Sequence, residues 1–217
     1  MSTLVYLGAG HGKAYPSGGY DPGAVSGSMV EEVNAEKVVA HAATALRRCG
    51  FAVEADVNAE QRSYVEAAAR ANAVHAAYAM EIHYNAGGGF GSEAYILTGA
   101  TTRTRSIAER ISRAVALACN HPDRGVKEQA DHYFNRVTSM PSCILEVAFL
   151  DNAADRGMVL ATGHHQRVGE AIASALCASF AIPYRPPVPV TPPTPPALSV
   201  DQRLAALESR VTKLEAR

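Results

Sequence analysis

The stretch 80–86 (Met-Glu-Ile-His-Tyr-Asn-Ala) is a largely apolar run that ends directly in three glycines, residues 87–89. The run predicts a buried strand, and the glycines predict that a loop follows it at once. His83 should therefore lie where a strand of an α/β sheet becomes a loop, which is where such folds carry their functional groups. A histidine there either ends the strand or binds a metal. Candidate ligands at the ends of other strands would favour the metal site, because zinc needs several converging ligands.

Strands and helices alternate along most of the chain. The predicted strands are residues 3–7, 51–57, 80–86, 92–98 and 142–149. The predicted helices are residues 28–49, 58–76, 102–119 and 164–180. The polar stretch 121–135 is predicted to be a surface loop with a short strand at 132–134. This alternation predicts a three-layer α/β domain in which helices flank a mostly parallel twisted sheet.

A glycine-rich turn, residues 8–12, follows the first predicted strand. A phosphate-binding loop would need a helix that starts at the glycines. Pro16 and Pro22 follow instead and postpone any helix to about Ser28. The glycines therefore allow the backbone to turn tightly around His11, which becomes a second candidate metal ligand.

Two adjacent glutamates, Glu31 and Glu32, stand in the first turn of the next predicted helix. Ser28 is predicted to cap this helix, with Glu31 as its partner in a capping box. Both glutamates can simply complement the helix dipole, an effect of about 0.3–1 kcal/mol. The functional alternative is that one of them is a third metal ligand.

One carboxylate, Glu146, interrupts the apolar strand predicted at 142–149. A buried ionised carboxylate is costly unless it is paired or bound to a metal. Glu146 is therefore a candidate functional residue. The alternative is a glutamate at the edge of the sheet whose head group reaches solvent.

The remaining histidines and the cysteines suggest no further site. The histidines predicted to lie at the surface or in an interface are His41, His75, His121, His132, His164 and His165, with only His132 expected near a site. The cysteines at 49, 119, 143 and 177 stand singly, without a Cys-x-x-Cys pair. They are predicted to be buried apolar residues rather than metal ligands or a redox pair.

The charge of the chain names no partner. Its net charge is −1, and charged residues make up 19% of it. This balance provides neither the basic stripe of a nucleic-acid-binding protein nor a polybasic membrane patch, so no nucleic acid and no membrane are expected as partners. The first residues lack the charged and apolar segments of a signal peptide. We therefore expect a soluble protein without an export signal of its own.

Four segments carry a family resemblance when they are taken together. They are Gly10-His11-Gly12 with Asp21-Pro22-Gly23-Ala24, the glutamate that opens the first helix, Ile82-His83-Tyr84-Asn85-Ala86 with Gly91-Ser92-Glu93, and Leu145-Glu146-Val147-Ala148-Phe149-Leu150-Asp151-Asn152. In this order and spacing they resemble the zinc-dependent N-acetylmuramoyl-L-alanine amidases of the amidase-3 type. The resemblance covers residues 1–182 and implies a catalytic domain of that extent.

The resemblance implies roles for individual residues. His11, Glu31 and His83 correspond to the zinc ligands, with Glu32 as the alternative to Glu31. Glu146 corresponds to the catalytic carboxylate.

Two further residues of the same motifs, Asn85 and Glu93, are candidates for substrate binding. The implied reaction is hydrolysis of the amide between the lactyl group of N-acetylmuramic acid and L-alanine in bacterial peptidoglycan. The chain looks most like a phage endolysin, which accumulates in the host cytoplasm and reaches the cell wall after holin-type release. The alternative is an inactive or wall-binding structural phage protein.

The composition changes abruptly after Ile182. Residues 183–198 are rich in proline, which predicts a semi-rigid linker. Residues 199–217 predict a short coiled-coil helix with apolar positions at Val200, Leu204, Leu207, Val211 and Leu214. We expect this helix to make the protein a homo-oligomer, with a trimer favoured over a dimer.

Overall fold

The computed structural model describes residues 2–57 and 62–188. The chain divides into two units, Met1–Pro186 and Pro187–Arg217. The predicted coiled-coil helix and most of the predicted linker lie outside the described residues. The boundary predicted after Ile182 stays a prediction, although Tyr184 and Arg185 still contact the first unit through Glu170 and Arg48.

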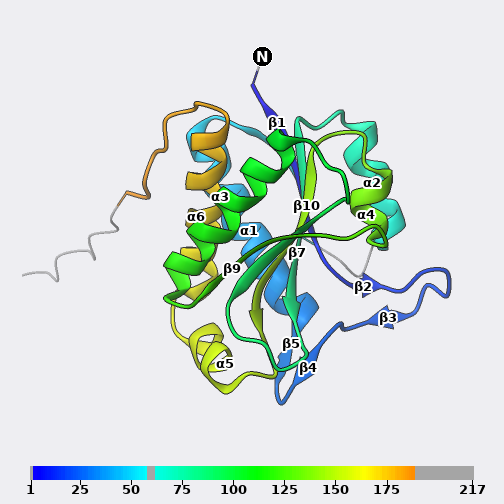
Figure 1. Cartoon of the computed structure of the whole chain (residues 1–217), viewed down its shortest axis with the longest axis vertical. Helices are drawn as coiled ribbons and strands as arrows, with labels where there is room; N and C mark the ends of the chain where they lie inside the picture. Colours follow the sequence, from blue (N-terminus) through cyan, green and yellow to red (C-terminus); the bar gives the residue numbers. More distant parts are fainter. Residues whose placement is uncertain (1, 58–61, 189–217) are drawn as a thin grey trace, which may run out of the picture. The chain divides into compact units, whose positions relative to one another are not determined.

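A six-stranded sheet forms the centre of the first unit in the described residues (Figure 1). Its strand order is β6 (Ala52–Asp56), β1 (Leu4–Ala9), β7 (Tyr78–Asn85), β10 (Ser142–Phe149), β8 (Ser92–Ile96) and β9 (Asp123–Glu128). Strands β6, β1, β7 and β10 pair in parallel, β8 is antiparallel to β10, and β9 is parallel to β8. The α/β fold with a mostly parallel sheet is therefore as the alternation of elements predicts.

Helices cover both faces of this sheet, as Figure 1 shows. The first face packs on α1 (Glu31–Cys49), α3 (Thr102–Cys119) and α6 (His164–Ser179). The second face packs on α2 (Tyr64–Ala73) and α4 (Tyr133–Val137). Helix α5 (Ala153–Leu160) follows β10 and contacts β10 and α6.

Strand β7 shows how the two faces divide the side chains. Successive side chains of a strand point to opposite faces, so Met80 and Ile82 enter the larger core beneath α1, while Ala79 joins the smaller core beneath α2. Glu81 and His83 continue the row of Ala79 beyond this smaller core. The second face therefore carries polar side chains at the carboxyl end of β7.

The first helix does not begin where the sequence predicts. It starts at Glu31 after Val30, with no side-chain cap, so the predicted capping box at Ser28 is wrong. The reason is a small hairpin in which β4 (Val25–Ser26) pairs with β5 (Met29–Val30) and keeps this segment extended. The helix predicted from residue 58 likewise begins at Tyr64 in α2, capped by Ser63 with Glu66.

The polar stretch 121–135 is also more regular than predicted. It contains edge strand β9, and α4 begins where a short strand was expected. Strand β9 has no buried residue. Because it buries no side chain, its sequence needs no alternation of apolar and polar residues, and the strand was not predicted. By contrast, α3 has the predicted bounds, and the four cysteines are buried and free as predicted. No helix in the described ranges combines the length and apolarity of a membrane span.

Candidate metal centre

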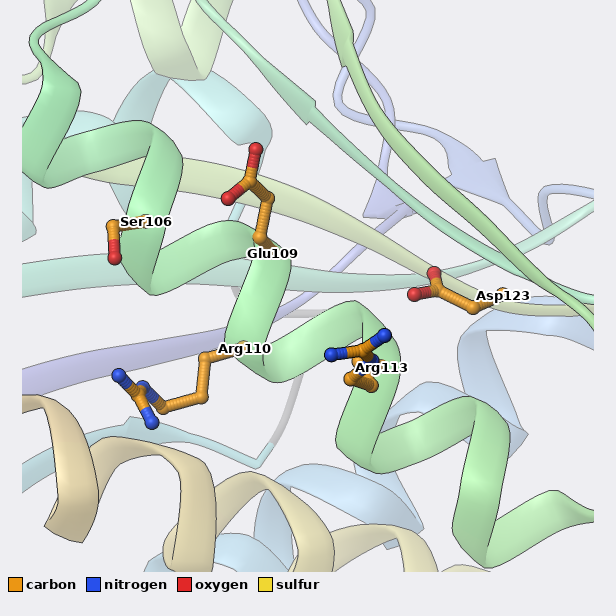
Figure 2. Close-up of a pocket in the computed structure, with 5 residues that line it drawn as sticks. All are labelled: Ser106, Glu109, Arg110, Arg113 and Asp123. Carbon is orange, nitrogen blue, oxygen red and sulfur yellow. The ribbon is translucent and has the colours of Figure 1, made fainter.

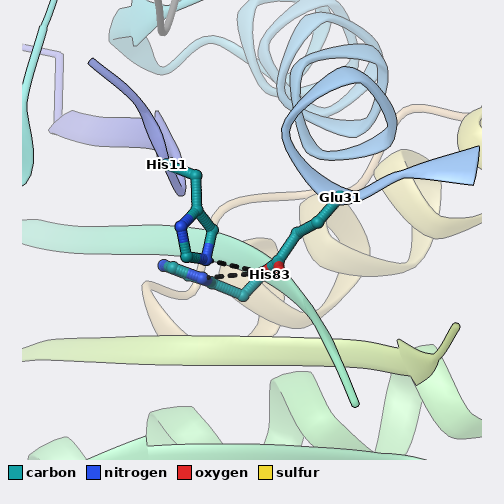
Figure 3. Close-up of side chains that lie close together, drawn as sticks. All are labelled: His11, Glu31 and His83. Atoms are coloured by element: carbon teal, nitrogen blue, oxygen red, sulfur yellow. Dashed lines mark hydrogen bonds and ion pairs between the residues drawn. The ribbon is translucent and has the colours of Figure 1, made fainter. Parts of the chain in front are cut away.

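His11, Glu31 and His83 converge from three separate elements (Figure 3). His11 follows β1, Glu31 is the first residue of α1, and His83 lies near the end of β7. One nitrogen or oxygen atom from each lies within 4.8 Å of the other two. The structure thus brings together the three residues that the resemblance implies as ligands.

The distances suit a tetrahedral zinc ion. Oε1 of Glu31 lies 3.2 Å from Nε2 of His11 and 3.0 Å from Nδ1 of His83. Zinc bonds of 2.0–2.1 Å in tetrahedral geometry separate neighbouring ligand atoms by roughly 3.3 Å. Two imidazoles and a carboxylate are a donor set that zinc accepts, so these residues fit the ion.

Backbone groups fix the carboxylate of Glu31. Oε2 accepts a hydrogen bond from the backbone N–H of Ala24 (2.7 Å), and Oε1 accepts one from that of Tyr84 (3.0 Å). Burial would raise the pKa of Glu31, but hydrogen bonds from His11 and His83 outweigh it and hold this pKa well below its usual range. Glu32 lies apart from this cluster, and its carboxylate accepts a hydrogen bond from the Tyr20 hydroxyl at 3.1 Å.

Asp21 orients the first histidine. Nδ1 of His11 donates a hydrogen bond to Oδ2 of Asp21 at 2.9 Å, which leaves Nε2 to face Glu31. Oδ1 of Asp21 is held by the backbone N–H of Gly23 at 3.0 Å. Ligand histidines commonly have such a carboxylate partner, which fixes the tautomer and the ring orientation. Asp21 belongs to the first segment of the resemblance, but nothing in the sequence alone marks it as the partner of His11.

Two glycines let the chain pass close to the cluster. A Cβ atom at Gly10 would lie 2.2 Å from the ring of His83, and one at Gly23 would lie 2.5 Å from both Glu31 and His11. Gly23 also has a φ of +67°, which favours glycine. Gly10 and Gly23, which both belong to the first segment of the resemblance, are therefore required by the site itself.

Glu146 stands beside the cluster on β10. In the strand register it is the direct neighbour of His83. Its Oε2 atom is buried and has no hydrogen-bond partner among the described residues. Burial raises the pKa of Glu146 to about 7; the charge of His83 opposes the shift, and Glu31 adds to it. A carboxyl group with this pKa can both accept and release a proton near neutral pH.

A pocket of about 530 Å³ contains the site. It is lined by His11, His83 and Glu146, and also by His132, the histidine predicted to lie near a site. The tyrosines of its wall touch edge to face: Tyr15 and Tyr64 with ring centroids 6.0 Å apart, and Tyr64 and Tyr133 with centroids 5.2 Å apart. The pocket therefore combines the candidate site residues with an aromatic wall.

Asn85 and Glu93, the candidate substrate-binding residues, contact each other. Nδ2 of Asn85 donates to Oε1 of Glu93 at 3.1 Å. The Glu93 carboxylate also accepts hydrogen bonds from Tyr95, Arg124 and Lys127. Because these partners surround it, Glu93 offers little free acceptor capacity to a ligand. Its role in substrate binding stays a prediction.

A separate hollow of about 430 Å³ lies along α3 (Figure 2). It is lined by Ser106, Glu109, Arg110, Arg113 and Asp123. None of the three clustered ligands or Glu146 belongs to it, and α3 packs on the opposite face of the sheet. This hollow is therefore separate from the candidate metal site formed by His11, Glu31 and His83.

Two histidines predicted to lie at the surface or in an interface have side chains that are buried within the fold instead. Nε2 of His121 lies 2.6 Å from Oγ of Ser92, and its Nδ1 lies 2.9 Å from Oδ1 of Asp155. His164 is fully buried, and its Nε2 lies 2.9 Å from the hydroxyl of Tyr84. These partners are distant in the sequence, so no local pattern marks either burial.

Comparisons with known proteins identify the family and the relatives of this chain. The family model described as N-acetylmuramoyl-L-alanine amidase (Amidase_3) matches residues 5–178. A sporulation-specific N-acetylmuramoyl-L-alanine amidase of Bacillus subtilis is 27% identical over 81% of this chain and 68% of its own length. The endolysin of Bacillus phage SPP1 is 31% identical over 78% of this chain and 66% of its own length. The chain thus spans about two thirds of each of these relatives.

The fold has solved counterparts. An N-acetylmuramoyl-L-alanine amidase from Clostridium difficile 630 superposes with a TM-score of 0.74 at 20% identity, covering 83% of this chain and 97% of that one. At this identity the likeness establishes the arrangement of the elements. The chemistry must be argued from the site.

Proposed function

Because the chain belongs to the N-acetylmuramoyl-L-alanine amidase family of peptidoglycan hydrolases, we propose that it cleaves the amide between the lactyl group of N-acetylmuramic acid and L-alanine with the help of zinc. The convergence of His11, Glu31 and His83 beside Glu146 carries this proposal. It supplies three ligands and a proton carrier within one pocket.

Each residue has a distinct task in the proposed mechanism. His11, Glu31 and His83 hold the ion, and Asp21 keeps the ring of His11 oriented. Zinc, when bound, supplies Lewis acidity that polarises a carbonyl and lowers the pKa of water toward about 7. Ligand histidines must be neutral, so His11 and His83 would each present an unprotonated ring nitrogen to the ion.

Glu146 carries the proton of the reaction. Its unpartnered Oε2 takes a proton from the attacking water and returns it to the departing alanine nitrogen. Burial raises the pKa of Glu146, which suits a group that must accept and then donate a proton at the same pH, whereas a bound zinc ion would lower that pKa. General acid–base catalysis of this kind contributes about 100- to 10,000-fold.

We propose a phage endolysin as the biological role. The similarity to the SPP1 endolysin supports this role, although bacterial amidases match as well. An endolysin would act on the host cell wall after holin-type release from the cytoplasm. The alternative is a structural or wall-binding phage protein without activity, and the presence of His11, His83 and Glu146 argues against it.

Product analysis on purified cell walls tests the proposal. We expect new amino termini of L-alanine without new reducing ends, loss of activity with a chelator, and recovery when zinc is added back. New reducing ends would indicate glycosidase chemistry and overturn the amidase assignment. Wall binding without any new ends would favour the structural alternative.

A further inference from the structure

Three acidic or basic side chains stand in a row across the sheet. The register pairs Glu146 of β10 with His83 of β7 on one side and with Glu93 of β8 on the other. Residues paired in this way point to the same face, and neighbouring strands lie about 4.8 Å apart. Glu93 therefore lies one strand spacing beyond the proposed proton carrier.

Glu93 anchors two cations from β9. Its side chain is 1% exposed, and Oε2 accepts hydrogen bonds from Nε of Arg124 and Nζ of Lys127, each at 2.6 Å. A buried carboxylate is costly without such partners. Both positive charges are consequently fixed at one point beside the row.

Aromatic rings hold the same two cations in place. The guanidinium of Arg124 lies 5.0 Å from the ring centroid of Phe149, and the ammonium of Lys127 lies 5.5 Å from that of Tyr95. Such stacking orients a cation while leaving most of its N–H donors available. Arg124 meets Glu93 through Nε, and among the described residues its two NH₂ groups have no acceptor, so they can bind one from a ligand.

The cation pair carries one charge more than Glu93 neutralises. In the described part of the chain, no other carboxylate pairs with Arg124 or Lys127. The two side chains remain 36% and 39% exposed. A second carboxylate from solution would balance the charge and would find oriented donors.

We propose that Arg124 and Lys127 bind the carboxylate of the second residue of the peptide that follows the scissile amide. This inference rests on the proposed function. In that substrate the lactyl carboxyl is consumed by the amide, so the glycan next to the bond is uncharged, whereas the peptide retains free carboxylates. The two cations therefore recognise the peptide part of the substrate and not the glycan part.

The reach of the peptide agrees with this assignment. An extended peptide advances about 3.3–3.6 Å per residue. In the proposed arrangement the peptide runs from Glu146 toward β8, which places its second residue one to two strand spacings from the scissile bond. Arg124 and Lys127 thus act in specificity, and Glu93 is the residue that positions them.

Binding of two product peptides, measured without turnover, tests the inference. The first peptide is L-alanyl-γ-D-glutamyl-L-lysine. The second is the same tripeptide with D-isoglutamine in place of D-glutamate, so a carboxamide replaces the carboxylate of the second residue. We expect the acid to bind about tenfold more tightly than the amide, as for one charge-assisted contact. Lys127→Met and Arg124→Gln should each reduce this preference, while Lys127→Arg should retain most of it.

Arg113→Gln is the matched control, because Arg113 is an exposed cation on α3 at the opposite face of the sheet (Figure 2). It should leave the preference unchanged. Equal binding of the two peptides by the unaltered protein would overturn the inference without any variant. Hydrolysis of the parent muropeptides is measured separately, so a failure of the amidase assignment is distinguishable from a failure of this inference.

Discussion

Nδ1 of His11 lies 2.9 Å from Oδ2 of Asp21, so a carboxylate that is itself tied to the backbone sets the direction of a proposed ligand. Asp21→Asn keeps the shape of this contact and removes the charge. We expect zinc affinity to fall about 10- to 100-fold, because such partners orient the ring and raise its basicity. Competition titration with a zinc-binding dye measures the change, and an unaltered affinity would contradict the role of Asp21.

The adjacent glutamates of α1 provide a matched pair. Glu31→Gln should lose zinc after dialysis, because Glu31 alone of the two meets both histidines. Glu32→Gln should retain one zinc per chain, because Glu32 meets Tyr20 instead. Elemental analysis decides between them. The reverse result would move the ligand by one residue.

Glu146→Gln should separate metal binding from catalysis. The variant keeps His11, Glu31 and His83, so we expect its zinc content to match that of the unaltered protein. Its amidase rate should fall about 100- to 10,000-fold, since the proton carrier is gone. A rate within a few-fold of the original, measured by release of alanine amino termini, would remove Glu146 from the mechanism.

His164 should make stability depend on pH. Burial lowers the pKa of His164 to about 3, and the nearby charge of His165 adds to this. An unfolded histidine has a pKa of about 6.5, so below that pH the unfolded chain binds a proton that the folded chain refuses. The contribution of His164 to the free energy of unfolding should therefore be constant above about pH 6.5 and should reduce stability by up to about 1.4 kcal/mol per pH unit below it.

Urea unfolding between pH 5 and 7 measures this slope. His164→Gln should flatten it, whereas His41→Gln, which alters an exposed histidine of α1, should not. Parallel curves for the unaltered protein and His164→Gln would refute the assignment.

The C-terminal residues predict self-association. Arg203 with Glu208, and Arg210 with Glu215, stand at positions where parallel helices pair between chains. A helix this short is marginal without partners, so the mass should rise with concentration. Sedimentation at tens of micromolar should give oligomers for the full chain and monomers for a chain that ends at Val188. Monomers for both would remove the prediction.

Local signals explain which elements the sequence predicts well. Helix α3 has its predicted bounds because Thr101 caps its start and Asn120 adopts the left-handed conformation at its end. The start of α1 is mispredicted because the pairing of β4 with β5 overrides the capping signal at Ser28. Strand β9 is missed because an exposed edge strand needs no apolar alternation.

Some contacts of the candidate site are predictable from the sequence and others are not. The family resemblance of the motifs predicts that His11, Glu31 and His83 act together, and the structure places them side by side. The contacts of Asp21 with His11, and of Tyr84 with His164, depend on how distant segments meet. No periodicity or spacing encodes such contacts, so only the folded chain reveals them.

The buried network of Ser92, His121 and Asp155 has the hydrogen-bond order of a serine hydrolase triad. Ser92 is nevertheless fully buried, and its hydroxyl also donates to the carbonyl of Val147. A search for catalytic side chains by geometry alone would select this trio. In activity-based profiling, a fluorophosphonate probe would therefore find no accessible nucleophile at Ser92, and this trio would stay unlabelled in the folded chain.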